Sequence, residues 1–376
     1  MRIGIDCRIW GVRHGGIGRY TQELVQNLQE LDKKNDYVLF CRATDFVNIP
    51  SRRNFRKVLA DIKHYTFAEQ LKLPGILARE NLDLLHTPHF NVPVLYKGKF
   101  VTTIHDLTWH EIKGLGVTTL SAPAYYFKYI AYRSVVKKTV SRAVKIIVPS
   151  NTIKKDLIRR FSLQPEKVVV TYEGATFTKG ENLKFKISNL KLLHKYNIQK
   201  PYILYVGSLY PHKNVEIVAR ALKTLAQPIP LLVIVSARNV FMKRFETFLK
   251  EIKADNLVQM VGYIPDKDLA TLYKASQGYI FPSLSEGFGL PGLEAMAYGT
   301  PVIASDIPVL KEIYGEAAVY FNPRSEIDIA AKIRQIISGE SLPKLLIRKG
   351  RERVKKFSWE KMAKETLAIY NSLQEN

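Results

Sequence analysis

Cysteine and long hydrophobic runs are both scarce in this sequence. Its 376 residues include two cysteines, Cys7 and Cys41, which are too few for a disulfide framework and fall in predicted buried strands. We therefore expect both to be reduced, small apolar side chains in a cytoplasmic protein. No apolar stretch reaches the ~20 residues that a membrane-spanning helix needs, and the opening MRIGIDCRIWG is too interrupted for a signal peptide. The sequence thus predicts no integral membrane domain.

Glycine and proline are not enriched either. The chain has 21 glycines and 18 prolines, with 46% hydrophobic and 24% charged residues. This is ordinary globular composition, and it excludes a collagenous, disordered or coiled-coil protein. A length of 376 residues suggests two domains.

Acidic residues are also scarce, mainly in the first half of the chain. Lys and Arg number 57 against 34 Asp and Glu, which gives a formal net charge of +23. Residues 1–200 hold 34 basic and 16 acidic side chains, and no acidic residue lies between Glu111 and Asp156. Such an asymmetric field implies an anionic partner for the first half. Nucleic acid, phospholipid and a sugar diphosphate all qualify, and net charge does not choose among them.

Short apolar runs alternate with amphipathic stretches along nearly the whole chain. The predicted strands are Arg2–Cys7, Tyr37–Cys41, Leu82–Thr87, Phe100–His105, Val144–Pro149, Val168–Tyr172, Tyr202–Gly207, Leu231–Ser236, Val258–Tyr263, Tyr279–Pro282, Pro301–Ala304 and Ala318–Phe321. The predicted helices are Gly18–Asp32, Phe67–Asn81, Pro123–Ser141, Asn151–Phe161, Asn214–Leu225, Phe241–Ala254, Asp266–Ala275, Pro291–Tyr298, Glu326–Ser338 and Trp359–Leu373. Strands that are apolar on both faces and joined by helices indicate parallel sheets covered on both sides. We predict an α/β protein with two doubly wound domains.

A lysine-rich stretch with few β-branched residues separates the two predicted domains. We place the linker at residues 175–200, the first domain at 1–174 and the second at 201–357. The final helix follows a break at Phe357–Ser358, and we expect residues 358–376 to pack back on the first domain.

Ligands of open α/β sheets bind at the carboxyl ends of the strands, where glycine-rich turns let backbone amides approach phosphate. The first such turn is Gly15-Gly16-Ile17-Gly18, after the first predicted strand. It is either an anion cradle or a flexible turn into a helix, and its spacing alone does not decide between them.

The second turn is SEGFGLPGLE, residues 285–294. It contains G-x-G-x-x-G, but a dinucleotide site carries that motif on the first strand of its unit, so a late copy followed by Asp306 fits a dehydrogenase poorly. Its distinctive feature is a pair of glutamates, Glu286 and Glu294, with seven residues between them. Such carboxylates can accept hydrogen bonds from sugar and ribose hydroxyls while the intervening amides hold a diphosphate. Alternatively, Glu286 only caps the helix and Glu294 is solvated.

Glu286-x7-Glu294 with GFGLP between resembles the E-x7-E motif of the retaining family-4 glycosyltransferases, which have the GT-B fold. The similarity covers nearly the whole chain, in the segments MRIGID, GGIGRY, TIHDL, YVGSLYPHKN, EGFGLPGLEAMAYGTPVIASD and FSWEKMAKETLAIY. The residues around these segments are especially similar to those of bacterial mannosyltransferases of surface polysaccharide synthesis. The resemblance implies two doubly wound, Rossmann-like domains facing an interdomain cleft.

The resemblance also implies roles for the matching residues. The catalytic residues would be His105 beside the reacting sugar, Lys213 on the departing diphosphate, and Glu286 on the hydroxyls of the transferred sugar. The donor-binding residues would be Gly16, Ser208, Ile264, Asp266, Phe288, Gly289, Leu290 and Glu294. Many relatives carry an arginine where this sequence has Ser208 or His212. Lys213 is therefore the remaining cation, and backbone amides and the helix dipole would contribute more to neutralising the diphosphate.

A metal site is not indicated. Asp266-Lys267-Asp268 looks like the D-x-D metal motif of other transferases, but acids are also favoured in the first turn of a helix. His86 and His89 lack further ligands at zinc spacing. His105 taken alone fits a buried core histidine better, and its place at a strand end within TIHDL reverses that interpretation. We predict no required metal and no cofactor, with a nucleotide-sugar donor as substrate.

The acid-free stretch combines basic with aromatic side chains. The aromatic residues on its predicted helix are Tyr125, Tyr126, Phe127, Tyr129 and Tyr132. This combination is typical of interfacial membrane helices, although a solvated helix with one core face stays open as an alternative. No nucleic-acid-reading module is recognisable. We predict an anionic membrane surface as a partner and no nucleic acid.

The predicted function is transfer of a hexose from a nucleotide diphosphate sugar to a hydroxyl of a lipid-linked or saccharide acceptor. By analogy the donor is GDP-mannose, and the product is a cell-surface polysaccharide made with retention at the anomeric carbon. The enzyme would be cytoplasmic and peripheral on the inner face of the plasma membrane. The alternatives are a nucleotide-sugar epimerase on the same fold and a non-catalytic binder of anionic surfaces or nucleic acid.

Overall fold

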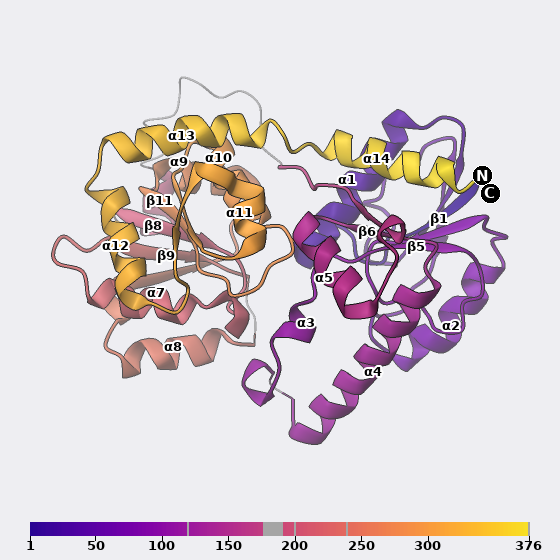
Figure 1. Ribbon diagram of the computed structural model, residues 1–376, viewed down its shortest axis with the longest axis horizontal. Helices are drawn as coiled ribbons and strands as arrows, with labels where there is room; N and C mark the ends of the chain where they lie inside the picture. The colour runs from indigo at the N-terminus through magenta and orange to yellow at the C-terminus, as the bar shows by residue number, and fades with distance from the viewer. Residues whose placement is uncertain (119, 176–190, 199–200, 238–239, 375–376) are drawn as a thin grey trace. The chain divides into compact units, whose positions relative to one another are not determined.

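The computed structural model describes residues 1–118, 120–175, 191–198, 201–237 and 240–374. The chain divides into two units, and each is described by itself (Figure 1). Unit 1 consists of Met1–Leu107, Leu120–Gly174 and Ser358–Asn376, and unit 2 of Thr108–Thr119 and Ala175–Phe357.

This division differs from the sequence-based domains in two segments. Thr108–Thr119 groups with unit 2 although it was predicted to belong to the first domain. Of the predicted linker, residues 176–190 and 199–200 lie outside the described residues, whereas Leu193 and Ile198 are buried side chains of unit 2. At least part of the predicted linker therefore belongs to the second unit.

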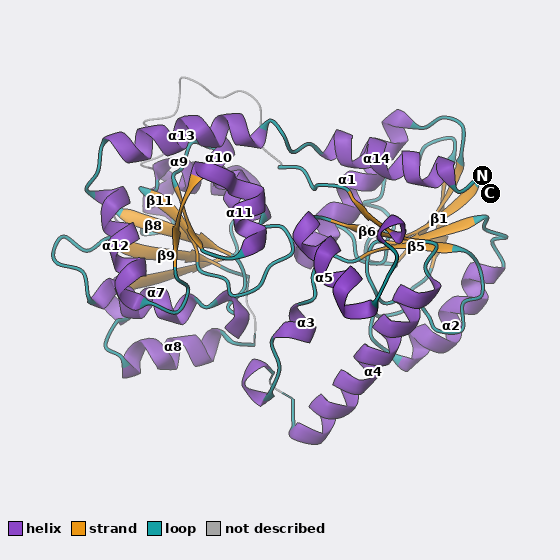
Figure 2. Cartoon of the chain, viewed as in Figure 1, coloured by secondary structure: helices purple, strands orange, loops and turns teal. Residues whose placement is uncertain are grey.

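Unit 1 contains a seven-stranded parallel sheet with the order β3-β2-β1-β4-β5-β6-β7. Figure 2 shows strands in orange and helices in purple. The strands are β1 (Arg2–Asp6), β2 (Asp36–Cys41), β3 (Phe55–Leu59), β4 (Leu84–Thr87), β5 (Phe100–Thr103), β6 (Lys145–Val148) and β7 (Val168–Val170). Its helices are α1 (Gly15–Leu31), α2 (Phe67–Ala78), α4 (Ala122–Arg142), α5 (Asn151–Phe161) and α14 (Trp359–Ser372). The sequence pattern does not predict β3, because this edge strand carries Arg56 and Lys57 and pairs with β2 alone.

Unit 2 contains a six-stranded parallel sheet with the order β10-β9-β8-β11-β12-β13. The strands are β8 (Tyr202–Val206), β9 (Leu231–Val235), β10 (Val258–Gly262), β11 (Gly278–Phe281), β12 (Val302–Ser305) and β13 (Ala318–Phe321). Its helices are α3 (Thr108–Glu111), α7 (Val215–Lys223), α8 (Met242–Glu251), α9 (Asp266–Ala275), α10 (Leu290–Ala297), α11 (Pro308–Tyr314), α12 (Glu326–Ile337) and α13 (Ser341–Val354). All six strands match predicted ones, and α3, α11 and α13 are additional helices.

Both sheets have a point at which the strand order reverses. It lies between β1 and β4 in unit 1 and between β8 and β11 in unit 2. Loops that leave neighbouring strands at such a switch point diverge to opposite faces of the sheet, which opens a crevice at the carboxyl edge. The segments after β8 and β11 hold Lys213 and Glu286, so the topology alone directs both to one place.

The last helix, α14, returns to unit 1 and packs against α1, as Figure 1 also shows. The Ser358 hydroxyl caps it by accepting a hydrogen bond from the Lys361 amide at 3.3 Å. On its inner face the fully buried Tyr370 hydroxyl bonds to His86 Nδ1. The C-terminal motif is therefore part of the core of unit 1.

Both cysteines are buried, unpaired thiols in unit 1. Burial raises the pKa of Cys41 to about 12 and that of Cys7 well above its ordinary value. Such thiols are protonated and inert at neutral pH. Among the described residues, no helix has the length and apolar character needed to cross a bilayer.

Candidate active site

The loop after β8 is fixed by a short 3₁₀-helix, η4 (Pro211–Lys213), and by Asn214. Asn214 adopts a left-handed backbone with φ 57°, a conformation that asparagine tolerates better than most residues. Its side-chain amide donates to the carbonyls of Pro282 at 3.1 Å and Pro323 at 2.8 Å. Lys213 is thus attached to a turn that is anchored on the end of β11.

The loop after β11 brings Glu286 to this turn. The Leu284 amide donates to the His212 carbonyl at 2.8 Å. Two residues further on, Lys213 Nζ lies 2.6 Å from Glu286 Oε1, with side chains that are 20% and 12% exposed. This is a partly buried ion pair between two residues that the sequence assigns to catalysis. The alternative that Glu286 caps α10 is wrong, because the N-cap residue is Gly289 and no side chain caps this helix.

The field of Glu286 reaches into the core of unit 2. Burial raises the pKa values of Tyr205, Tyr279 and Tyr314, and the negative charge of Glu286 raises each of them further. A carboxylate that acts on three buried phenols lies at the border of a low-dielectric region, where interactions with a charged ligand are stronger than in water.

Packing explains the glycines of the second turn. Gly289 has φ 101°, and a Cβ atom there would lie 2.5 Å from the Tyr314 hydroxyl. A Cβ atom on Gly292 would lie 2.2 Å from the same oxygen. The Tyr314 hydroxyl donates to the Gly289 carbonyl at 2.6 Å. These glycines admit a tyrosine against the start of α10, so the G-x-G-x-x-G spacing has a structural cause unrelated to dinucleotides.

Glu294 is 9% exposed, and its Oε2 atom accepts a hydrogen bond from Tyr273 at 3.4 Å. The alternative of a solvated Glu294 is therefore wrong. Phe288 is buried, and its ring packs edge-on against Phe357 with centroids 5.5 Å apart. Its side chain is therefore part of the core of unit 2.

The remaining donor-binding candidates of unit 2 lie on neighbouring loops. The Ser208 carbonyl accepts from the Tyr205 hydroxyl at 2.7 Å, after β8. Ile264 is buried after β10, and Asp266 is exposed as the first residue of α9. Leu290 begins α10 and is largely buried. Like Lys213 and Glu286, these residues follow strands or begin helices of unit 2, whereas Glu294 lies one turn inside α10.

Two candidates belong to unit 1. Gly16 is in the first turn of α1, and the nearby Gly18 permits a close approach, since a Cβ atom there would lie 2.2 Å from the Gly11 carbonyl. His105 follows β5, where Nδ1 lies 2.8 Å from Glu173 Oε1 and Nε2 lies 3.1 Å from the Pro88 carbonyl. The sequence pattern does not single out Glu173, because its partner is 68 residues away in the chain.

The segment Thr108–Glu111 contributes to unit 2 beside Glu286. The Ser285 hydroxyl, directly before Glu286, donates to Glu111 Oε2, and Thr108 Oγ1 lies 3.4 Å from the same hydroxyl. The sequence analysis assigned no role to this segment, because its place beside Glu286 depends on a contact with a residue that comes much later in the chain.

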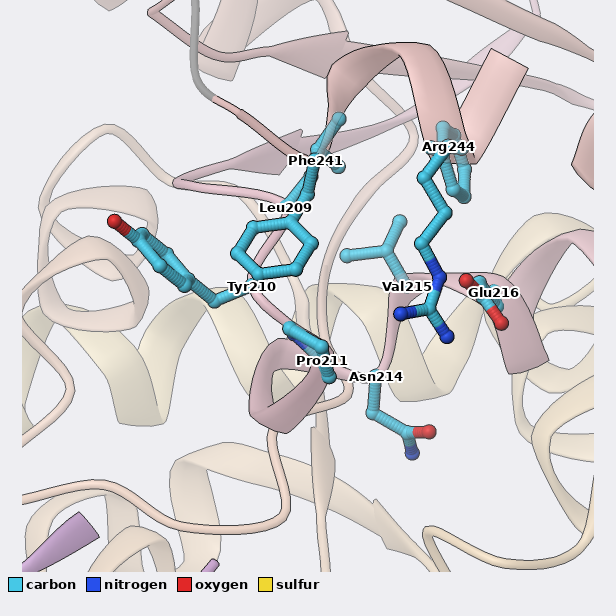
Figure 3. A pocket seen from close by; sticks show the side chains of 9 residues that line it. Leu209, Tyr210, Pro211, Asn214, Val215, Glu216, Phe241 and Arg244 are labelled. Atoms are coloured by element: carbon cyan, nitrogen blue, oxygen red, sulfur yellow. The ribbon is translucent and has the colours of Figure 1, made fainter. Parts of the chain in front are cut away.

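A pocket of about 80 Å³ is lined in part by Pro211 of the η4 turn and by Asn214, which follows it. Figure 3 shows it between the start of α7 and α8, with the Arg244 guanidinium directed toward Val215 and Glu216. Aromatic and aliphatic side chains form the rest of its wall, among them Tyr210 and Phe241. Arg244 Nη1 also donates to the Gly116 carbonyl at 3.0 Å, so the guanidinium is already held in place.

Two Rossmann-like parallel-sheet units, with an acidic and basic pair at the switch point of the second, define a protein of the GT-B class. The family described as Glycosyltransferase Family 4 matches residues 14–177, and that described as Glycosyl transferases group 1 matches residues 191–353. The chain belongs to these glycosyltransferases. The predicted family and fold class are thereby confirmed.

Individual relatives agree with this. The chain is 27% identical to O-antigen chain mannosyltransferase B of Escherichia coli, over 95% of this chain and 96% of the relative. It is 27% identical to O-antigen chain mannosyltransferase RfbU of Salmonella typhimurium, over 80% of this chain and 77% of the relative.

Solved structures share the fold. Sucrose-phosphate synthase from Thermosynechococcus elongatus matches with a TM-score of 0.77 at 22% identity, over 100% of this chain and 99% of that one. HepE of Anabaena, solved in complex with UDP and glucose, matches with a TM-score of 0.73 at 17% identity, over 99% of this chain and 100% of that one.

Proposed function

We propose that this glycosyltransferase moves mannose from GDP-mannose to a hydroxyl of a saccharide or lipid-linked acceptor, with retention, in the synthesis of a surface polysaccharide. The two relatives named as O-antigen mannosyltransferases support mannose and this class of product. The complex of HepE with UDP and glucose supports a nucleotide diphosphate sugar as the donor class.

The ion pair between Lys213 and Glu286 is the observation that carries the proposal. Its Nζ–Oε1 distance is 2.6 Å at the switch point of the unit 2 sheet. An entering diphosphate competes with Glu286 for the Lys213 ammonium. The ammonium then stabilises the negative charge that develops on the diphosphate as the glycosidic bond breaks. Glu286 is then released to accept hydrogen bonds from the sugar hydroxyls. In the free enzyme each of the two side chains is the ionic partner of the other.

The carboxylates of unit 1 support attack by the acceptor on the same face as the leaving group. Asp6 and Glu69 each lie 2.7 Å from Nη2 of the fully buried Arg8. Burial alone would raise the pKa of Asp6, but the Arg8 guanidinium holds it well below its ordinary value. Carboxylates that are engaged in this way are poor nucleophiles. Asp6 and Glu69 are therefore poor candidates for the nucleophile of a covalent glycosyl-enzyme intermediate, and Glu173 is engaged with His105 Nδ1, which supports front-face attack.

A panel of nucleotide sugars tests the proposed function. The purified protein is incubated with GDP-mannose, UDP-glucose, UDP-galactose and UDP-N-acetylglucosamine, with and without mannosylated acceptors, and released nucleoside diphosphate is measured. We expect GDP release from GDP-mannose, increased by acceptor, and an α-linked product by NMR. Preference for another donor would overturn the assignment of mannose as the transferred sugar. A β-linked product would overturn retention at the anomeric carbon. No transfer from any donor would overturn the proposal as a whole.

We expect transfer to continue in excess EDTA. Asp268, one of the two acids of the D-x-D sequence, accepts hydrogen bonds from Lys195 Nζ at 2.8 Å and from the Tyr196 hydroxyl at 2.7 Å. These hydrogen bonds, that of Lys195 first, hold the pKa of Asp268 below its ordinary value. A cation would have to displace an ammonium. Complete loss of transfer in EDTA, restored by Mn²⁺ or Mg²⁺ but not by Ca²⁺, would show that a metal is required.

The outer surface of α2 and α4 supports peripheral binding to an anionic bilayer. The exposed apolar side chains on these two helices of unit 1 are Phe67, Leu71, Tyr126, Phe127 and Ile130. Phe67 and Phe127 have ring centroids 6.4 Å apart, so both helices contribute to one patch. Helix α4 carries five exposed cations, of which Arg142 donates to the carbonyls of Val94 and Tyr96. The other four are Lys128, Arg133, Lys137 and Lys138. Apolar side chains beside cations fit a surface of anionic lipid.

Changing these four cations to glutamine should weaken binding to vesicles that contain anionic lipid. Each cation near such a surface contributes ~1 kcal/mol, so we expect the partition coefficient to fall by about tenfold or more in sedimentation at low salt. The matched control changes Lys250, Lys344, Lys355 and Lys356 of unit 2, which removes the same charge. Equal losses of vesicle binding in both variants would show that the effect depends on net charge and not on α4. Tight binding of duplex DNA without any binding of vesicles would favour a nucleic-acid partner.

A further inference from the structure

His105 and Glu173 form a buried pair in unit 1. Nδ1 of His105 lies 2.8 Å from Oε1 of Glu173, and the two side chains are 11% and 5% exposed. The Tyr20 ring makes a T-shaped contact with the imidazole ring, with centroids 4.7 Å apart and planes at 81°. The imidazole is therefore held by a carboxylate at Nδ1 and by a perpendicular aromatic ring.

The neighbouring histidines have a different environment. His86 is fully buried between the hydroxyls of Tyr370 and Thr103, and burial lowers its pKa to about 3. Burial also lowers the pKa of His89 well below its ordinary value. These two are neutral parts of the core. Of the three, His105 is the histidine with a carboxylate on its ring.

The position of Glu173 depends on the C-terminal motif. The next residue, Gly174, packs so closely on α14 that a Cβ atom there would lie 2.2 Å from the Trp359 amide nitrogen. Trp359 begins α14, and its side chain is largely buried. The contact between Gly174 and the FSW segment thus fixes the backbone that carries Glu173, which gives that motif a role at the carboxyl edge of the sheet.

We propose that Glu173 is a positioning residue that holds His105 so that its Nε2–H is presented to the transferred sugar. The inference rests on the proposed function, in which His105 lies beside the reacting sugar. The Glu173 carboxylate accepts the Nδ1 hydrogen and fixes the ring orientation. Both ring nitrogens face acceptors, so the two contacts together require the doubly protonated imidazolium, in which Nε2 donates to the Pro88 carbonyl at 3.1 Å. A sugar oxygen shares or replaces that carbonyl as the acceptor. Carboxylate partners of this kind orient functional histidines in other sites.

Variants of Glu173 test the inference through the separation of kcat from KM. Loss of a residue that orients a functional histidine costs about 10- to 100-fold in activity. We expect Glu173→Ala to lower kcat by that factor with donor KM within about twofold. Glu173→Gln keeps a hydrogen-bonding partner for Nδ1 but removes the negative charge that favours the doubly protonated ring, so it should recover only part of the loss. The control is Asp32→Asn, a buried carboxylate of unit 1 that accepts hydrogen bonds from Tyr37 and Asn35, whose kcat should stay normal even if the melting temperature falls.

The His105→Ala background separates the two claims. If Glu173 acts through His105, Glu173→Ala should add nothing to the loss caused by His105→Ala. An equal additional loss in that background, or an effect of Glu173→Ala that follows only the folded fraction, would overturn the inference. Normal activity of His105→Ala would instead remove His105 from the proposed function, and the inference with it.

A measurement without substrate tests the contact directly. In ¹⁵N-histidine-labelled protein, the Nδ1–H of His105 should give a slowly exchanging signal, assigned by its loss in His105→Ala. That signal should persist in Asp32→Asn and disappear in Glu173→Ala. Its persistence in Glu173→Ala would contradict the inference even if the variant is inactive.

Discussion

Replacing Glu286 with alanine should lower kcat by about 10²- to 10³-fold, the size of effect expected when a preorganised group that stabilises the transition state is removed. The carboxylate has two functions in this account, to hold Lys213 in the free enzyme and to accept sugar hydroxyls as the glycosidic bond breaks. Only the hydrogen bonds to the sugar hydroxyls lower the activation free energy of bond cleavage. The donor KM should therefore not rise, since loss of the carboxylate leaves Lys213 fully available to the diphosphate.

Steady-state kinetics with the best donor of the panel, together with thermal melting, measure this effect. The matched control is Glu316→Ala, which breaks an exposed ion pair in the same unit, where Glu316 lies 2.7 Å from Lys349. Exposed pairs of this kind contribute little, so the control should have normal kcat. A normal kcat in Glu286→Ala would rule out the assigned role in sugar recognition.

Replacing Lys213 with methionine should have a comparably large effect for a different reason. The substitution keeps the length of the side chain and removes the charge that faces the departing diphosphate. A charge-assisted hydrogen bond contributes ~1.5–3 kcal/mol, so we expect the affinity for GDP to fall by about 10- to 100-fold. The value of kcat should fall as well, because charge accumulates on the diphosphate as the bond breaks.

Lys213→Arg should retain part of the activity, and Lys349→Met, the other half of the exposed pair, should retain all of it.

The ion pair with Glu286 also predicts that Lys213→Met lowers the stability of the folded protein. Lys213→Met leaves a carboxylate that is 12% exposed without its ammonium, which is less favourable than removing both charges. The double variant Lys213→Met with Glu286→Gln should therefore melt at a higher temperature than Lys213→Met alone. The opposite order would mean that the pair does not stabilise unit 2.

The central pair could be predicted from the sequence because its two residues follow strands whose apolar runs are unambiguous. Strands β8 and β11 are buried, and Lys213 and Glu286 come a few residues after their ends. Since parallel strands end at one edge of a sheet, a motif after each strand is enough to place both residues at that edge. Their direct contact was not predictable, because it depends on how Asn214 and the Leu284 amide fix the two loops.

Other features depend on contacts that leave no local pattern. Helix α13 has a glycine in its interior, Gly350, whose absent side chain lets Met296 of α10 approach to 3.1 Å of the position a Cβ would take. In a sequence, such a glycine argues against a helix. Glu173 looks like any polar residue after a strand until His105 is placed beside it. Thr108–Thr119 groups with unit 2 through Ser285 and Arg244, which come much later in the chain.

Titration calorimetry of GDP against the wild type and Glu286→Gln tests the central claim most directly, namely that Lys213 is shared between Glu286 and the donor diphosphate. Glutamine keeps the shape of the side chain but no longer competes for the ammonium. We expect Glu286→Gln to bind GDP more tightly than the wild type while its kcat falls, and Lys213→Met to bind GDP more weakly than either. Weaker binding of GDP to Glu286→Gln, or unchanged binding to Lys213→Met, would contradict it.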